Sequence, residues 1–184
     1  MQKFFAVLLF ALAACSSPEL PPMYPVPEAD LVDENGRAVS LASLKGNIVV
    51  YDFIFTSCTA TCPIMTGAMQ ELTEKIDADA PVKFVSISVD PTNDTPAVLR
   101  AYAQKHRKDP RWIFLTGDRD TIVKLSVQGF KLAAGDPMPG SEPVLHSTKF
   151  VVADKGGMIR EYYGATDGDA PKHVAKTVKA LLKE

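Results

Sequence analysis

Two cysteines four residues apart are the residues of this sequence best suited to chemistry. Cys58 and Cys62 are the first and last residues of the segment CTATC, and they follow an apolar run that ends at Phe55. Residues four apart share one face of a helix, so both sulfurs can converge on one point. A helix N-terminus favours negative charge and lowers the pKa of a thiol, which stabilises the thiolate. This spacing therefore predicts a pair that binds a soft metal ion or exchanges disulfides.

A histidine is the expected third ligand if the metal is copper, because imidazole and thiolates both suit copper. The chain has three histidines, of which His106 and His173 each adjoin a lysine. We expect these two to be solvated. His146 ends a proline-containing loop just before a predicted strand, and loops fixed by a rigid scaffold often carry function. On position alone, His146 is either a ligand or a structural residue.

Strands and helices alternate along the part of the chain that would position these residues. The expected strands cover residues 47–55, 82–89 and 112–115, and the expected helices begin at Cys62, Thr95 and Asp118. Turn residues predict hairpins within residues 31–39 and 147–163, and a last helix begins near Lys172. The alternation predicts an α/β fold with a central sheet flanked by helices. A strand followed at once by a helix that opens with a cysteine pair is the layout of thioredoxin-like folds.

The beginning of the chain predicts a bacterial lipoprotein signal. Lys3 precedes an unbroken apolar run over residues 4–14, which is too short for the about 20 residues that span a bilayer. The run ends in LAAC, with Cys15 last, and this resembles a lipoprotein processing box in which cleavage leaves the cysteine lipidated. We expect residues 1–14 to be the signal peptide and Cys15 the lipid attachment site. The alternative is an ordinary signal with an incidental cysteine.

Composition and charge indicate one secreted domain behind this signal. Residues 15–28 contain five prolines, which predicts a semi-extended tether, and the folded domain then covers residues 29–184. The chain of 184 residues is 46% hydrophobic, as expected for one globular domain. It has 20 basic and 22 acidic residues and no long basic run, which argues against a nucleic-acid partner. The signal predicts an oxidising location at the periplasmic face of a bacterial membrane.

Four segments, taken in order, resemble the Sco/SenC family of copper proteins. They are FTSCTATCP, VSISVDPTNDTP, RWIFLTGDRD and VLHSTKFVVADKGGMIREYYGA, and the resemblance covers roughly residues 29–183. It implies a thioredoxin-like fold with a mixed sheet and an extra N-terminal β-hairpin. It also implies that Cys58, Cys62 and His146 bind copper, as Cu(I) or Cu(II). Asp90 is either a residue that supports this site or a turn residue.

The function implied by the resemblance is that of a metallochaperone. Such a protein would help to assemble the copper site of cytochrome c oxidase, with a subunit of that enzyme as the recipient. The alternative is an enzyme, a thiol–disulfide reductase with Cys58 and Cys62 as its redox pair. His146 separates the two hypotheses, because disulfide exchange needs no histidine from a distant loop. The C-x3-C spacing also differs from the C-x-x-C of thioredoxin-like redox motifs.

Overall fold

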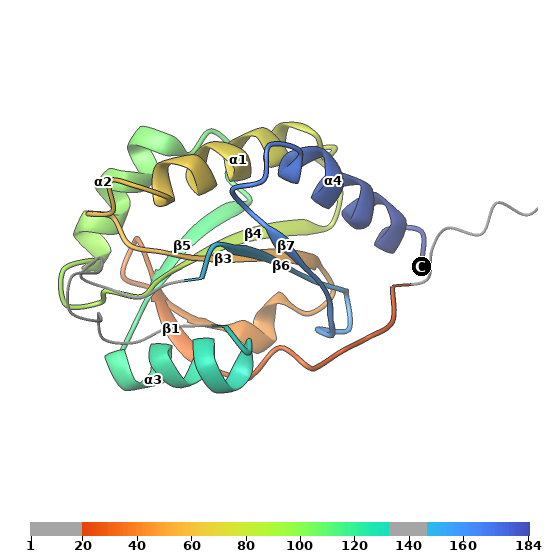
Figure 1. Ribbon diagram of the computed structural model, residues 1–184. Coiled ribbons are helices and arrows are strands. Elements are labelled where there is room, and N and C mark those ends of the chain that lie inside the picture. The colour runs from red at the N-terminus through yellow and green to blue at the C-terminus, as the bar shows by residue number, and fades with distance from the viewer. Residues whose placement is uncertain (1–19, 133–146) are drawn as a thin grey trace, which may run out of the picture.

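A seven-stranded mixed sheet forms the centre of the structure, a computed structural model that describes residues 20–132 and 147–184 (Figure 1). Its strands are β1 (Asp30–Asp33), β2 (Ala38–Ser40), β3 (Ile48–Ile54), β4 (Val82–Ser88), β5 (Trp112–Thr116), β6 (Lys149–Ala153) and β7 (Ile159–Gly164). Their order in the sheet is β2-β1-β5-β4-β3-β6-β7. Strands β3, β4 and β5 are parallel, and the other neighbours are antiparallel.

Helices cover both faces of this sheet. Helices α1 (Cys62–Glu74), α2 (Pro96–His106) and α4 (Ala170–Leu181) lie on one face, and α3 (Arg119–Lys124) with the π-helical turn η2 (Leu125–Gly129) lies on the other (Figure 1). A short 3-10 helix, η1 (Leu41–Leu44), joins β2 to β3. Each of α1, α2 and α4 has a proline in its first turn, where the fixed φ suits a helix and no N–H is required.

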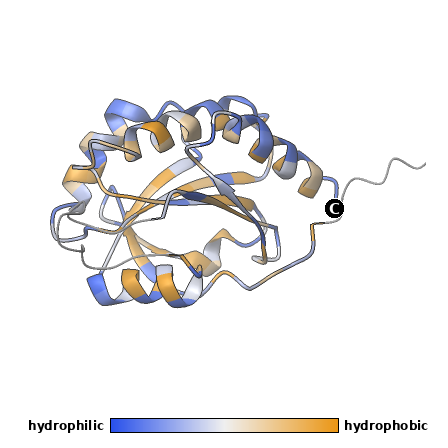
Figure 2. Cartoon of the chain, in the orientation of Figure 1, coloured by the Kyte–Doolittle hydropathy of each residue, from blue (hydrophilic) through white to orange (hydrophobic). Residues whose placement is uncertain are grey.

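Strand β3 runs through the core, and every one of its residues is buried. The rings of Tyr51 and Phe53 lie 5.0 Å and 5.3 Å from that of Phe130, which follows η2. Because successive side chains of a strand point to opposite faces, Asp52 points to the face covered by α1. Figure 2 shows the hydrophobic residues along the strands and on the inner sides of the helices.

The segment before β1 is bonded to the edge of the sheet. The Met23 N–H donates to the Ile159 carbonyl at 2.8 Å, and the Ile159 N–H donates to the Tyr24 carbonyl at 2.7 Å. The Val26 N–H donates to the Gly157 carbonyl at 2.8 Å. The described part of the predicted tether therefore lies alongside the start of β7, the last strand of the sheet, and is bonded to it and to the turn before it.

The thioredoxin-like α/β fold predicted from the sequence is confirmed, including its mixed sheet and N-terminal hairpin. Each predicted strand and helix is present close to its expected position. Met65 and Met69 of α1 are fully buried, as their helical spacing predicts. No helix within residues 20–132 and 147–184 is long and apolar enough to cross a membrane.

Candidate functional site

The structure brings Cys58 and Cys62 together at the start of α1. After β3 the chain turns, and the Cys58 N–H donates to the Phe55 carbonyl at 3.2 Å. Cys62 is the first residue of α1, and its N–H donates to the Cys58 Sγ at 3.3 Å. Neither cysteine is part of a disulfide bond. The helix N-terminus therefore points an N–H group at one sulfur while it carries the other.

The two thiols differ in how readily they ionise. Burial raises the pKa of Cys58, but hydrogen bonds from Cys62, Ala60 and Thr61 outweigh it, so the pKa lies below its ordinary value. Cys62 is 1% exposed, and burial raises its pKa far above the ordinary value. The negative charges of Cys58 and Asp52 raise it further. One sulfur is thus prepared to become a thiolate, and the other is held protonated.

Asp52 is a buried carboxyl group on the side of β3 that faces α1. It is fully buried, and neither oxygen has a hydrogen-bond partner within the described parts of the chain. Burial raises its pKa to about 7, against a smaller lowering effect of Ser86. The Ser86 hydroxyl lies across the ladder from Asp52 and accepts a hydrogen bond from Trp112 Nε1 at 2.9 Å. Asp52 was not predicted as a site residue, although it is the one charged residue in the run NIVVYDFIF.

A second buried carboxylate, Asp94, fixes the turn that leads to Cys58. It accepts hydrogen bonds from the Thr56 N–H at 3.0 Å and from the Thr56 hydroxyl at 2.5 Å. The Ser88 hydroxyl donates to the same carboxylate at 2.6 Å. Thr56 follows β3 and Asp94 follows β4, and these neighbouring parallel strands end at the same edge of the sheet. Asp94 therefore links, by hydrogen bonds, the loops that follow β3 and β4 at the carboxyl ends of these strands.

Asp90, by contrast, has the local role of a turn residue. Its carboxylate accepts a hydrogen bond from Asn93 Nδ2 at 2.8 Å. Its carbonyl accepts from the N–H groups of Asn93 and Asp94 at 3.1 Å and 2.8 Å. These contacts show Asp90 as a turn residue, and its support of the proposed copper site stays a prediction. For Asp94, the sequence offers only its position in a loop after a predicted strand. It does not show which residue of that loop points inward.

His146 and Cys15 lie outside the described residues. His146 directly precedes Ser147, where the second described segment begins. Strand β6 is antiparallel to β3, with Tyr51 opposite Val151 and Val49 opposite Ala153. The start of β6 therefore lies beside the end of β3, from which the chain continues to Cys58.

His106 and His173, which the sequence predicts to be at the surface, are both half-buried and partly exposed. The His106 ring lies 4.4 Å from that of Tyr102, one helical turn earlier. The Nε2 atom of His173 lies 2.7 Å from Glu161 Oε1, and its ring stacks on Tyr163 at 3.9 Å. Among residues 20–132 and 147–184, no three His, Cys, Asp or Glu side chains form a group that could hold a metal ion.

Comparison with known proteins gives a consistent result. The SCO1/SenC family model matches residues 26–183. The crystal structure of a SCO1/SenC family lipoprotein from Bacillus anthracis is similar, with a TM-score of 0.76 and 32% identity over 86% of this chain and 95% of that one. BsSco, a member of the Sco family of cytochrome c oxidase assembly proteins that contains a disulfide switch, has a TM-score of 0.76 and 32% identity over 89% and 96%. Copper-bound ScoI from Bradyrhizobium japonicum has a TM-score of 0.73 and 28% identity over 86% and 99%.

Proposed function

Because the chain belongs to the SCO1/SenC family, we propose that it is a copper-binding metallochaperone that takes part in assembling the copper site of cytochrome c oxidase. Cys58, Cys62 and His146 are the proposed ligands, and a cytochrome c oxidase subunit is the proposed recipient. Two similar proteins support this function. ScoI from Bradyrhizobium japonicum has a structure with copper bound, and BsSco belongs to the cytochrome c oxidase assembly proteins.

The observation that carries the proposal is the pair of thiols at the start of α1, joined by the hydrogen bond from the Cys62 N–H to the Cys58 Sγ at 3.3 Å. Two thiolates are soft ligands that suit Cu(I), and an imidazole completes a set that copper accepts. The thiolate of Cys58 is already favoured by hydrogen bonds from the N–H groups of Ala60, Thr61 and Cys62. A bound cation would also favour the thiolate of Cys62, which the protein alone disfavours.

Cu(I) affinity, measured by competition with a chromogenic chelator, tests the ligand set. We expect Cys58→Ala and Cys62→Ala to abolish tight binding and His146→Ala to weaken it strongly. His106→Ala is the matched control, because it removes a histidine whose ring lies 4.4 Å from that of Tyr102 and leaves the proposed ligands intact. If His146→Ala binds Cu(I) as tightly as the His106 control, His146 is not a ligand.

A thiol–disulfide reductase is the second candidate, and the difference between the two thiols supports it. The Cys58 thiolate would attack one sulfur of a substrate disulfide, forming a mixed disulfide and releasing the other sulfur as a thiolate. Cys62, once deprotonated, would then attack Cys58, which releases the second substrate thiol and oxidises the pair to a disulfide. His146→Ala should retain this exchange with a disulfide peptide while it loses copper. Loss of exchange with full copper affinity would favour the reductase function instead.

We further propose that the protein is held at the periplasmic face of a bacterial membrane by a lipid on Cys15. The similar Bacillus anthracis protein is a lipoprotein. Cys15→Ala should block signal processing or release the protein into the soluble fraction, whereas Cys58→Ala should leave it in the membrane fraction. A processed Cys15→Ala protein that still sediments with membranes would refute the lipid anchor.

A further inference from the structure

Three lysines of helix α4, together with Lys183 in the turn that follows it, form a single stripe. Lys172, Lys176, Lys179 and Lys183 follow one another at intervals of four, three and four residues, and all four are exposed. At 3.6 residues per turn this spacing places the three helical lysines on one side of α4 over about 10 Å, and Lys183 follows just after the helix ends. Val174, Val178 and Leu181 occupy the opposite side and are buried in the core.

The charge of this lysine stripe is not compensated by its surroundings. None of its four ammonium groups forms an ion pair within the described segments. The nearby acids have other partners: Glu161 contacts His173, Glu184 binds Arg160, and Glu71 binds Lys75. The whole chain has a net charge of −2, so this concentration of positive charge is a local property.

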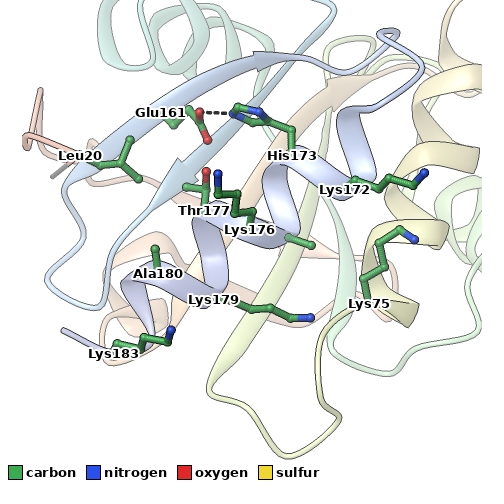
Figure 3. A pocket seen from close by; sticks show the side chains of 11 residues that line it. Leu20, Lys75, Glu161, Lys172, His173, Lys176, Thr177, Lys179, Ala180 and Lys183 are labelled. Atoms are coloured by element: carbon green, nitrogen blue, oxygen red, sulfur yellow. Dashed lines mark hydrogen bonds and ion pairs between the residues drawn. The ribbon is translucent and has the colours of Figure 1, made fainter. Parts of the chain in front are cut away.

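A groove of about 650 Å³ runs along the same helix (Figure 3). Leu20, Ala175 and Ala180 contribute apolar surface to it. The four lysines of the stripe and Lys75 of α1 lie around it, together with the Glu161–His173 pair. An apolar groove surrounded by ammonium groups is complementary to a phospholipid, which joins a phosphate to an apolar body.

The N-terminal segment brings this groove close to the proposed anchor. Leu20 lines the groove, and its carbonyl accepts a hydrogen bond from Arg160 Nε at 2.5 Å. Cys15 is only five residues earlier. A fully extended chain spans at most about 3.6 Å per residue, so Cys15 can be no farther than about 18 Å from Leu20. A lipid on Cys15 would hold the groove next to the bilayer.

We propose that the lysine stripe and its groove dock onto anionic phospholipid headgroups of the membrane that holds the protein. The proximity argument rests on the proposed anchor, whereas the charge and the groove are independent of it. Each lysine near an anionic surface strengthens the binding of a protein to the membrane roughly fivefold, so four lysines together should strengthen it about 10²- to 10³-fold. The interaction should weaken as the salt concentration rises.

Vesicle sedimentation tests the docking surface without the anchor or copper. The chain from residue 15 onward, carrying Cys15→Ser, contains the complete sheet and core and has no acyl chain. We expect it to bind vesicles of phosphatidylcholine with phosphatidylglycerol and to leave vesicles of phosphatidylcholine alone unbound. Changing the four stripe lysines to Gln should reduce binding by at least about 10²-fold. The matched control changes four exposed lysines on α2, on α3 and in the adjoining loops to Gln, namely Lys105, Lys108, Lys124 and Lys131.

The possible results are distinct. Loss of binding in the stripe variant and retention in the control supports the proposal. Equal losses in both variants would show that net charge alone is responsible and would overturn it. No binding of the unsubstituted chain would also overturn it and would favour an acidic protein as the partner of this face. Copper affinity and the fractionation of Cys15→Ala report separately on the proposed function.

Discussion

Replacement of Asp94 by alanine tests whether this buried carboxylate holds the Cys58 turn in place. The substitution removes the acceptor of three hydrogen bonds, from the Thr56 N–H, the Thr56 hydroxyl and the Ser88 hydroxyl. A hydrogen bond to a charged group contributes about 1.5–3 kcal/mol, and such contributions are not additive in one network. A buried donor that loses its acceptor costs about 1–3 kcal/mol, so three donors that share this cost correspond to about 3–5 kcal/mol. We therefore expect the free energy of unfolding to fall by about that amount.

Asp94→Asn is the matched variant, because it keeps the shape of the side chain. Its carbonyl can accept from the Thr56 N–H and the Ser88 hydroxyl, while its amide donates to the Thr56 hydroxyl. Only the charge is lost, and neutral hydrogen bonds have about half the strength of charge-assisted ones. We expect a cost of about 1–2 kcal/mol in the free energy of unfolding. Because residues that support metal ligands affect affinity about 10- to 100-fold, Asp94→Ala should weaken Cu(I) binding within that range.

Urea unfolding of the reduced proteins and Cu(I) competition provide the two measurements. Asp90→Ala is the control, since Asp90 bonds within its own turn and does not contact Thr56. Equal free energies of unfolding for Asp94→Ala and Asp94→Asn would contradict the stabilising role of these hydrogen bonds, and the assigned role also fails if folded Asp94→Ala binds Cu(I) as tightly as Asp90→Ala.

Three further predictions concern the residues around this turn. Burial raises the pKa of Asp52 from 3.8 to about 7, so between these pH values the folded protein binds more protons than the unfolded chain. Its free energy of unfolding should therefore decline as the pH rises from about 4 to about 7. Denaturation experiments across this range should show no such decline in Asp52→Asn. With limiting iodoacetamide at neutral pH, mass spectrometry should find Cys58 modified before Cys62, and the reverse order would contradict the assigned pKa difference. At a thousandfold excess over Kd, Cu(I) should stabilise the dithiol protein by about 4 kcal/mol and raise its melting temperature much more than that of the disulfide form; equal shifts would exclude the two thiols as the copper site.

The sequence predicted the fold well because each element has a local cause. The apolar run of β3 and the prolines in the first turns of α1 and α2 act within a few residues. The cysteine pair was equally visible, since four residues of helix place both side chains on one face. Patterns of this kind require no knowledge of the tertiary structure.

The residues that the sequence did not reveal depend on contacts between distant segments. Asp94 acts on Thr56 across 38 positions of the chain, and only the parallel pairing of β3 with β4 brings their loops together. The burial of Asp52 depends on α1 covering that face of the sheet. The bonding of residues 23–26 to β7 was unexpected because prolines disfavour strands. It is possible because Met23 and Val26, which have N–H groups, are the donors.

The bonding of residues 23–26 to β7 also bears on self-association. Strand β7 ends the sheet, and an open edge with unpaired N–H and C=O groups invites another chain to pair with it. Three main-chain hydrogen bonds to the N-terminal segment occupy the beginning of this edge. The covering segment offers few donors of its own, since it contains Pro21, Pro22, Pro25 and Pro27. If the proposed lipid anchor confines copies of the protein to a membrane plane, they meet at high local concentration, and this proline-rich segment would hinder the pairing of β7 with a strand of another copy.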